Sequence, residues 1–127
     1  SFGMTDMAWH TLTEPFEGDV EQFEAVSMAP TQVLPVVSGT AMAPAFGHIF
    51  SGGYAAGYYG YKWAEVLEAD AFSLFKEKGI FNREAASSFR ENVLSKGGTE
   101  HPMELYVRFR GHKPETRALI EKMGLGK

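Results

Sequence analysis

The strongest constraint on the fold is a long stretch without charge, since residues 25–61 contain no Asp, Glu, Lys or Arg. A transmembrane helix needs roughly 18 or more uninterrupted apolar residues. Three prolines and six glycines break this stretch, so we reject a membrane-spanning segment. An uncharged but interrupted segment is instead typical of backbone that packs against other protein or lines a cleft.

Composition limits the partners of the chain. Its 127 residues suffice for one ordinary domain or a piece of a larger one. The net charge of −4 gives no electrostatic reason to expect nucleic acid, whose binding proteins carry basic patches. The absence of cysteine excludes a disulfide scaffold and a thiolate metal site. Apolar side chains begin at Phe2 with no signal-peptide pattern, so we expect a piece of a longer protein.

The N-terminal half predicts two short helices and a proline-rich connection. Residues 2–12 form the first expected helix, and Asp19 is a suitable N-cap for a second helix over residues 20–28. Pro30, Pro35 and Pro44 then exclude a long helix. Because Pro35 lies inside the extended run "QVLPVVSG", a full strand is also unfavourable.

The C-terminal half predicts helix after helix. We expect helices over residues 53–78, 82–96 and 102–110, and a fourth helix from residue 114, separated by Gly, Pro and Asn. The expected core face of the longest helix consists of Tyr59, Trp63, Val66, Leu67, Leu74 and Phe75. The predicted class is all-α, a single helical region over residues 1–127. It comprises short helices and a connection (1–45), a Gly/Tyr loop (46–61) and a helical part (54–127).

The segment "HIFSGGYAAGYYGY" (48–61) holds four of the five tyrosines. Spacings of four and three place Tyr54, Tyr58 and Tyr61 on one face of the expected helix, and Glu65 and Glu68 continue that face. Unpaired carboxylates are almost never fully buried. The stripe is therefore expected to be the wall of a cleft, which is neither dry core nor open surface.

Glycines accompany the tyrosines. Gly52 and Gly53 can bend the chain and let backbone approach a ligand closely. Gly57 and Gly60 each cost about 1 kcal/mol relative to alanine inside a helix, and close approach by a partner offsets such a cost. The alternative is a helix crossing built on small residues, with the tyrosines as ordinary packing.

Recognisable catalytic motifs are absent. The four histidines (His10, His48, His101 and His112) show no His-Glu-x-x-His spacing, which would place two metal ligands on one helix face. There is no Gly-x-Ser-x-Gly elbow, no cysteine nucleophile and no phosphate loop. We expect His10 to be a structural histidine, and His101 and His112 to be solvated.

Two segments carry a family resemblance. "FGHIFSGGYAAGYYGYKWAEVLEADAF" (46–72) and "LSKGGTEHPMELYVRFRG" (94–111) resemble the C-terminal end of the thimet-oligopeptidase-like zinc metallopeptidases. "DMAWH" (6–10) and "FE" (23–24) are similar to preceding segments of that family. The resemblance covers nearly the whole chain.

The resemblance implies a mostly helical catalytic domain closed over a deep channel. It implies zinc in the parent enzyme, held by a His-Glu-x-x-His helix and a further glutamate, and a water activated by the glutamate of that motif. These ligands are absent from this sequence, so no residue here is assigned to metal. The implied partners are short peptide substrates and the upstream zinc-binding part of the same polypeptide.

The resemblance also implies roles for the Gly/Tyr loop. His48 resembles a substrate-positioning histidine, and Tyr54 resembles a tyrosine that contacts the peptide main chain. Tyr58 and Tyr61 resemble hydroxyl donors that face the scissile carbonyl, and Tyr61 is the first choice for stabilising the tetrahedral intermediate. The paired glycines Gly52 and Gly53 complete the expected substrate-binding set.

Several functional alternatives stay open. The resemblance implies a peptidyl-dipeptidase that releases C-terminal dipeptides, with an endo-acting oligopeptidase as the alternative, in the bacterial cytoplasm. This chain alone should be inactive. A non-catalytic module that binds peptides, or associates with itself through the uncharged stretch, is a second hypothesis. Arg108 and Arg110 suit recognition of a substrate carboxylate, although pairing with acids such as Glu104 is favoured.

Overall fold

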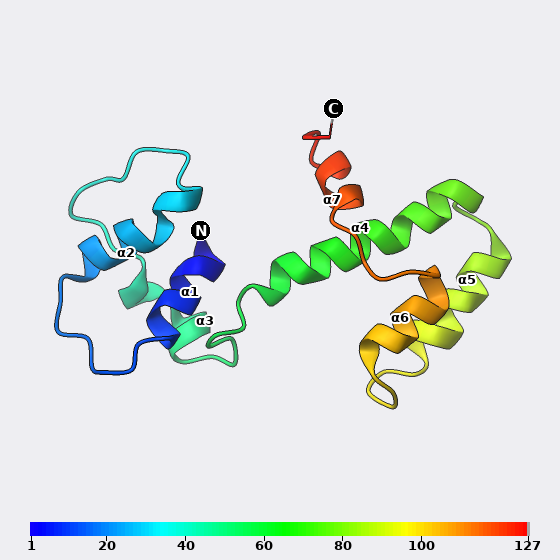
Figure 1. Ribbon diagram of the computed structural model, residues 1–127, viewed down its shortest axis with the longest axis horizontal. Helices are drawn as coiled ribbons and strands as arrows, with labels where there is room; N and C mark the ends of the chain where they lie inside the picture. The colour runs from blue at the N-terminus through cyan, green and yellow to red at the C-terminus, as the bar shows by residue number, and fades with distance from the viewer. Residues whose placement is uncertain (127) are drawn as a thin grey trace. The chain divides into compact units, whose positions relative to one another are not determined.

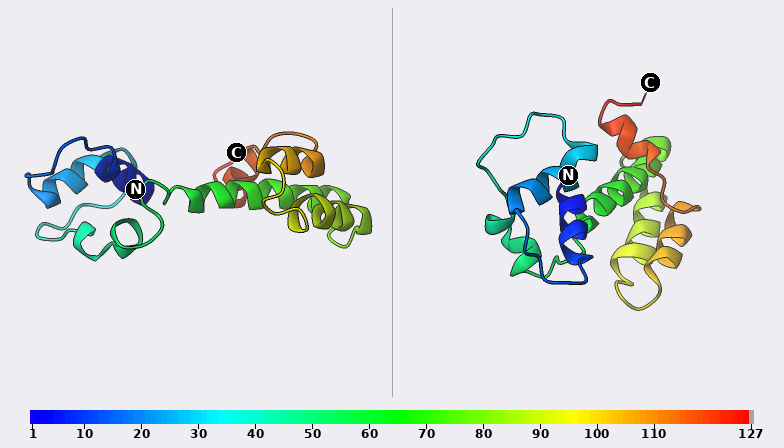
Figure 2. Two further views of the ribbon diagram at one scale, coloured as in Figure 1. Left: turned by 90° about the horizontal axis from the view of Figure 1, so that it is seen from below. Right: turned by 60° about the vertical axis from the view of Figure 1, so that its left-hand side comes forward.

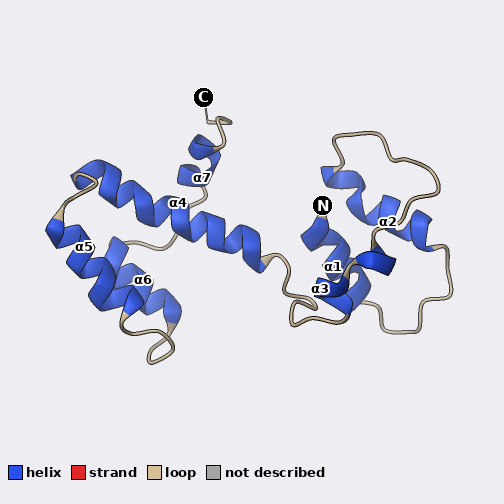
Figure 3. Ribbon diagram, turned by 180° about the vertical axis from the view of Figure 1, so that it is seen from behind, coloured by secondary structure: helices blue, strands red, loops and turns tan. Residues whose placement is uncertain are grey.

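The computed structural model describes residues 1–126, and every regular element in them is helical (Figures 1 and 3). The prediction of an all-α fold is confirmed. The chain divides into two compact units, Ser1–Tyr61 and a second that begins at Lys62. Among the described residues, no helix is both long enough and apolar enough to cross a membrane.

The first unit consists of short helices joined by loops. Its elements are α1 (Phe2–His10), α2 (Val20–Met28), η1 (Ala29–Thr31), η2 (Ala43–Ala45) and α3 (Gly47–Phe50). The predicted N-cap is confirmed, because the Asp19 carboxylate accepts a 2.9 Å hydrogen bond from the Gln22 N–H. The prolines keep the connection between α2 and α3 free of long helices, as expected.

Two glutamates of α2 hold that proline-rich connection. Glu24 is 5% exposed and accepts hydrogen bonds from the backbone N–H groups of Met42, at 2.7 Å, and Ala43. Glu21 accepts one from the Gly39 N–H at 2.8 Å. Since a buried carboxylate needs donors to compensate its lost hydration, these contacts satisfy the glutamates and attach the uncharged loop to a helix.

Aromatic side chains join the helices of the first unit. The Trp9 ring of α1 lies 4.2 Å from the Phe23 ring of α2 and 5.9 Å from the Phe50 ring of α3, measured between centroids. Phe16, from the loop between α1 and α2, packs edge-on against Trp9 at 5.0 Å. Ile49 of α3 is almost fully buried. These contacts place α3 firmly against α1 and α2.

The second unit is a small helical assembly. Its elements are α4 (Gly60–Lys78, which starts in the last residues of the first unit), α5 (Arg83–Phe89), the π-helical turn η3 (Arg90–Leu94), α6 (Pro102–Arg110) and α7 (Arg117–Lys122). Figures 1 and 2 show α6 beside the segment formed by α5 and η3. The buried core consists of Ala71, Leu74, Ala85, Tyr106 and Phe109.

Local signals set most helix ends in the second unit. The Asn82 side chain accepts a 2.9 Å bond from the Ala85 N–H and so begins α5 as predicted. Gly79, with φ of 105°, follows α4, and Gly111, with φ of 89°, ends α6. Both glycines occupy the left-handed region that closes helices. The last helix begins at Arg117, later than the expected residue 114.

The predicted start of the longest helix is also wrong. Helix α4 begins at Gly60, whereas residues 51–59 form successive turns. The backbone of Ala56 has φ of 53°, which a right-handed helix excludes. The predicted packing of Tyr59 and Trp63 is also wrong, because the two side chains are 59% and 43% exposed. Without a helix over residues 53–59, the periodicity that assigned Tyr59 to a core face does not apply.

We expect Phe109→Ala to lower the free energy of unfolding by about 3–5 kcal/mol, because it leaves a cavity among the rings of Phe75, Phe89 and Tyr106. Phe81→Ala is the matched control, since Phe81 is 95% exposed and its loss should change the value by less than about 0.5 kcal/mol. Urea denaturation of the two variants measures the difference. Equal losses would contradict the described core.

Candidate functional site

Four of the predicted site residues lie together. We define the tyrosine cluster as His48 of α3, Tyr54 and Tyr58 of the following turns, and Tyr61 in the first turn of α4. The rings of Tyr54 and Tyr61 stack at 5.1 Å with an interplanar angle of 26°, and Tyr58 lies 5.0 Å from Tyr61. The His48 ring lies 5.9 Å from Tyr54 and 6.0 Å from Tyr58.

The tyrosine cluster is accessible to a ligand. Tyr54 is 41% exposed and Tyr61 is 46% exposed, while Tyr58 is half-buried. Beneath them, the buried Phe46 ring packs edge-on against Tyr58 at 4.9 Å. The rings therefore rest on an apolar support and keep part of each side chain open to solvent.

The tyrosines meet through turns and not through a helical stripe. The Gly57 N–H donates to the Tyr54 carbonyl at 2.9 Å, and the Tyr61 N–H donates to the Tyr58 carbonyl at 3.2 Å. The carboxylates expected to continue the stripe are exposed and paired, since Glu65 pairs with Lys62 on α4 at 2.6 Å. Glu68 likewise pairs with a lysine, Lys122 of α7, at 2.6 Å.

The paired glycines differ in their roles. A Cβ atom on Gly52 would lie 2.9 Å from the His48 carbonyl oxygen, so only glycine fits the tight turn after α3. A Cβ atom on Gly53 would meet nothing within 4 Å. Gly53 is therefore not needed for packing within the described residues, and its backbone faces open space beside the tyrosine cluster.

A buried carboxylate of α1 holds the turns in place. Asp6 has no exposed surface. Its Oδ1 accepts a 2.9 Å hydrogen bond from the Ala56 N–H, and its Oδ2 accepts one from the Tyr58 N–H at 2.9 Å. The left-handed Ala56 is thus one of the two residues that Asp6 holds. No role for Asp6 was predicted from the sequence, although an acidic residue among the apolar Met4, Met7 and Trp9 of one short helix was a usable signal.

His10 completes this arrangement. Its Nδ1 lies 2.8 Å from the Asp6 Oδ1 and 2.9 Å from the Asp6 backbone carbonyl oxygen. Because both partners are acceptors, Nδ1 carries the proton and donates. The expectation of a structural role for His10 fits this geometry.

The surroundings of Tyr61 favour the neutral form of its phenol. The pKa of Tyr61 is raised above its ordinary value, first by the interaction with the Tyr54 side chain and then by partial loss of hydration. A neutral phenol can donate its O–H to an oxygen that gains negative charge. The cluster therefore offers adjacent hydroxyl donors at neutral pH.

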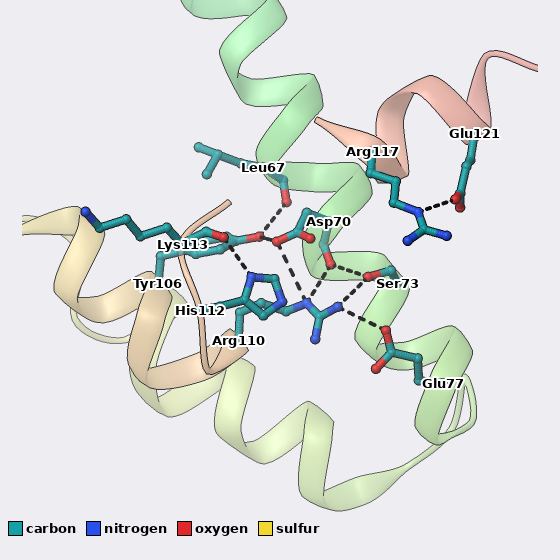
Figure 4. A network of polar contacts seen from close by, with 10 residues as sticks. All are labelled: Leu67, Asp70, Ser73, Glu77, Tyr106, Arg110, His112, Lys113, Arg117 and Glu121. Atoms are coloured by element: carbon teal, nitrogen blue, oxygen red, sulfur yellow. Dashed lines mark hydrogen bonds and ion pairs between the residues drawn. The ribbon is translucent and has the colours of Figure 1, made fainter. Parts of the chain in front are cut away.

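The arginines of α6 are engaged within the second unit, and Figure 4 shows the contacts of Arg110. Arg110 donates to the Asp70 carbonyl at 3.1 Å and to the Glu77 carboxylate at 3.0 Å, and Asp70 also accepts from the buried Tyr106 hydroxyl at 2.5 Å. Arg108 pairs with Glu100 at 2.7 Å and is the first cause that lowers the pKa of Glu100 to about 2. Pairing with acidic side chains, the favoured expectation, accounts for both arginines.

A cluster of candidate metal ligands is not found among the described residues. Over residues 1–126, no three His, Asp or Glu side chains lie close enough together to hold a metal ion. Three of the histidines make separate contacts. His10 pairs with Asp6, His48 belongs to the tyrosine cluster and His101 caps α6 through its Nδ1.

Comparison with known proteins identifies the family to which the chain belongs. The model of peptidase family M3 matches residues 1–125, and the chain belongs to this family. It is 48% identical to oligopeptidase A of Escherichia coli (strain K12) over 125 residues, and 39% identical to the dipeptidyl carboxypeptidase of that organism over 127 residues. It is also 41% identical to a probable cytosolic oligopeptidase A of Arabidopsis thaliana over 130 residues.

These matches cover 98% of this chain but only 18–19% of each relative. The chain thus spans less than a fifth of the length of these relatives. The family resemblance drawn from the Gly/Tyr segment is confirmed.

We expect the Tyr61 phenol to titrate above its ordinary pKa of 10, since the Tyr54 side chain favours its neutral form. Tyr54→Phe should lower the pKa of Tyr61 toward 10, whereas Tyr59→Phe should leave it unchanged. NMR titration of the labelled tyrosine ring carbons reports each phenol separately. Indistinguishable Tyr61 curves in wild type and Tyr54→Phe would contradict the described contact.

Proposed function

We propose that the full-length protein containing this chain is a metallopeptidase that hydrolyses short peptides, and that this chain supplies the substrate-binding side of its active site. One observation carries the proposal. In a chain that belongs to peptidase family M3, the tyrosine cluster presents neighbouring phenols and an imidazole on an exposed surface. Hydroxyl and imidazole groups are suitable donors to peptide carbonyls.

Each member of the cluster has a proposed role. Tyr61 and Tyr58 donate hydrogen bonds to the oxyanion that forms when water attacks the scissile carbonyl. Tyr54 and His48 bind the substrate main chain. The open backbone at Gly53, next to the tight turn at Gly52, lets an extended peptide approach closely.

The proposed metal is zinc, held by residues outside this chain. Zinc supplies Lewis-acid chemistry and an activated water when bound. The residues described here bind and orient the peptide and donate protons in hydrogen bonds. We also propose a cytoplasmic location, because one relative is named a cytosolic oligopeptidase A.

The cleavage mode has two candidates. The Gly/Tyr segment suits both a peptidyl-dipeptidase, which removes C-terminal dipeptides, and an endo-acting oligopeptidase. The higher identity to oligopeptidase A, 48% against 39% for the dipeptidyl carboxypeptidase, supports the endo-acting alternative. Mass spectrometry of the products distinguishes internal cuts from successive release of dipeptides.

We expect the full-length protein to hydrolyse a blocked short peptide and to lose this activity on treatment with a metal chelator. The 127-residue chain alone should show no turnover, because its described residues hold no metal cluster. A fluorogenic peptide assay measures both proteins. Hydrolysis by the short chain would contradict the proposed division of roles.

The same assay tests a non-catalytic alternative. Val33, Leu34 and Val37 of the uncharged stretch are 91%, 74% and 67% exposed, which favours association with another surface. A full-length protein that binds peptides without hydrolysing them, or a short chain that self-associates in analytical ultracentrifugation, would support an interaction module.

Tyr61→Phe in the full-length protein should lower kcat by roughly 10²–10³-fold with a smaller change in KM, because it removes a donor that acts mainly in the transition state. Tyr59→Phe is the control, since Tyr59 is 59% exposed and lies outside the tyrosine cluster. Steady-state kinetics on one peptide measures both variants. An unchanged kcat for Tyr61→Phe would remove Tyr61 from the proposed mechanism.

A further inference from the structure

A carboxylate without a role in substrate contact lies directly behind the tyrosine cluster. Asp6 is fully buried and is separated from Ala56 and Tyr58, the residues that it holds, by 50 and 52 positions in the sequence. Both of its oxygens accept backbone N–H groups, one from Ala56 and one from Tyr58. It therefore fixes the main chain on both sides of Gly57.

The chemistry of the site requires an ionised carboxylate. Two N–H donors aimed at two different oxygens need two acceptors, and only the carboxylate form accepts through both oxygens without a competing proton. The His10 Nδ1–H donates to the same Oδ1 that binds Ala56, at 2.8 Å. Asp6 thus has three donors, which compensate the cost of burying its charge.

The held backbone is itself unusual. Ala56 has φ of 53°, a backbone conformation that residues with a Cβ atom adopt only when their surroundings impose it. The hydrogen bond from its N–H to Asp6 provides that constraint. Two residues later the second hydrogen bond fixes the backbone of Tyr58, whose ring contacts both Tyr54 and Tyr61.

We propose that Asp6, oriented by His10, is a positioning residue for the peptidase reaction: it holds the turns so that the Tyr58 and Tyr61 hydroxyls converge on the reacting carbonyl. The proposal rests on the proposed function. Asp6 touches no substrate and acts through the backbone of residues 56–58. Its effect should therefore appear in the transition state, where hydrogen-bond direction matters most, and disappear when both phenols are removed.

The direct test is Asp6→Asn in the full-length protein. Asparagine keeps the size of the side chain but turns one acceptor into an NH₂ donor, which opposes the N–H of Ala56 or Tyr58. The matched control is Glu24→Gln, because Glu24 is also a buried carboxylate of the first unit that accepts two backbone N–H groups, but those of Met42 and Ala43.

We expect Asp6→Asn to lower kcat by about 10- to 100-fold with a smaller change in KM, and Glu24→Gln to change kcat by less than about threefold. In a Tyr58→Phe/Tyr61→Phe background, Asp6→Asn should lower kcat by less than about a further threefold, since its effect passes through the two phenols. Equal losses in the two carboxylate variants, or full additivity with the double phenol variant, would overturn the positioning role.

His10 provides a second route if Asp6→Asn fails to fold. His10→Asn can keep an N–H donor near the position of Nδ1, whereas His10→Phe removes the donor but keeps a ring against Phe50, 5.6 Å away. We expect kcat of His10→Asn to stay within about twofold of the wild-type value. We expect kcat of His10→Phe to fall by about 3- to 10-fold. Equal kcat in the two variants would overturn the role of His10.

These outcomes separate the inference from the function on which it rests. A wild-type full-length protein without peptide hydrolysis would refute the proposed function itself. Hydrolysis by wild type together with control-like kinetics in Asp6→Asn would refute only the positioning role.

Discussion

The site depends on one interaction, the pair of hydrogen bonds from the Ala56 and Tyr58 amides to the buried Asp6 carboxylate. Residues 51–59 have neither the regular hydrogen bonds of a helix nor a strand partner that would fix them. A charged acceptor in the adjacent helix α1 supplies the missing order. The tyrosine cluster is therefore an arrangement that two separate parts of the sequence make together, and a substitution in α1 can disturb it.

The same kind of contact, a carboxylate that accepts backbone N–H groups, recurs along the uncharged stretch of residues 25–61. Asp6 holds its C-terminal part, Glu24 holds residues 42–43 and Glu21 holds Gly39, in each case through backbone N–H groups. All three acids lie outside the stretch, on α1 and α2. A segment without charges of its own can thus take a defined path when carboxylates of flanking helices bind its backbone, which also satisfies amides that would otherwise lack partners.

The sequence predicted the parts of the fold that depend on local chemistry. Capping at Asp19 and Asn82 and termination at Gly111 follow from single residues, and the structure confirms them. The helix expected over residues 53–59 is wrong because tyrosine spacings of four and three match helical periodicity by coincidence, while a tertiary contact imposes a left-handed residue at Ala56. The role of Asp6 was missed because its partners lie about 50 residues away, beyond any local pattern.

Amide hydrogen exchange of the full-length protein tests this account most directly. The amides of Ala56 and Tyr58 lie in turns, where exchange is ordinarily fast, yet both donate to a fully buried carboxylate. We predict that both amides exchange far more slowly than the same sequence in an unstructured peptide, and that Asp6→Asn removes the protection of at least one. Exchange at the rate of the unstructured peptide in the wild-type protein would contradict the central role of Asp6.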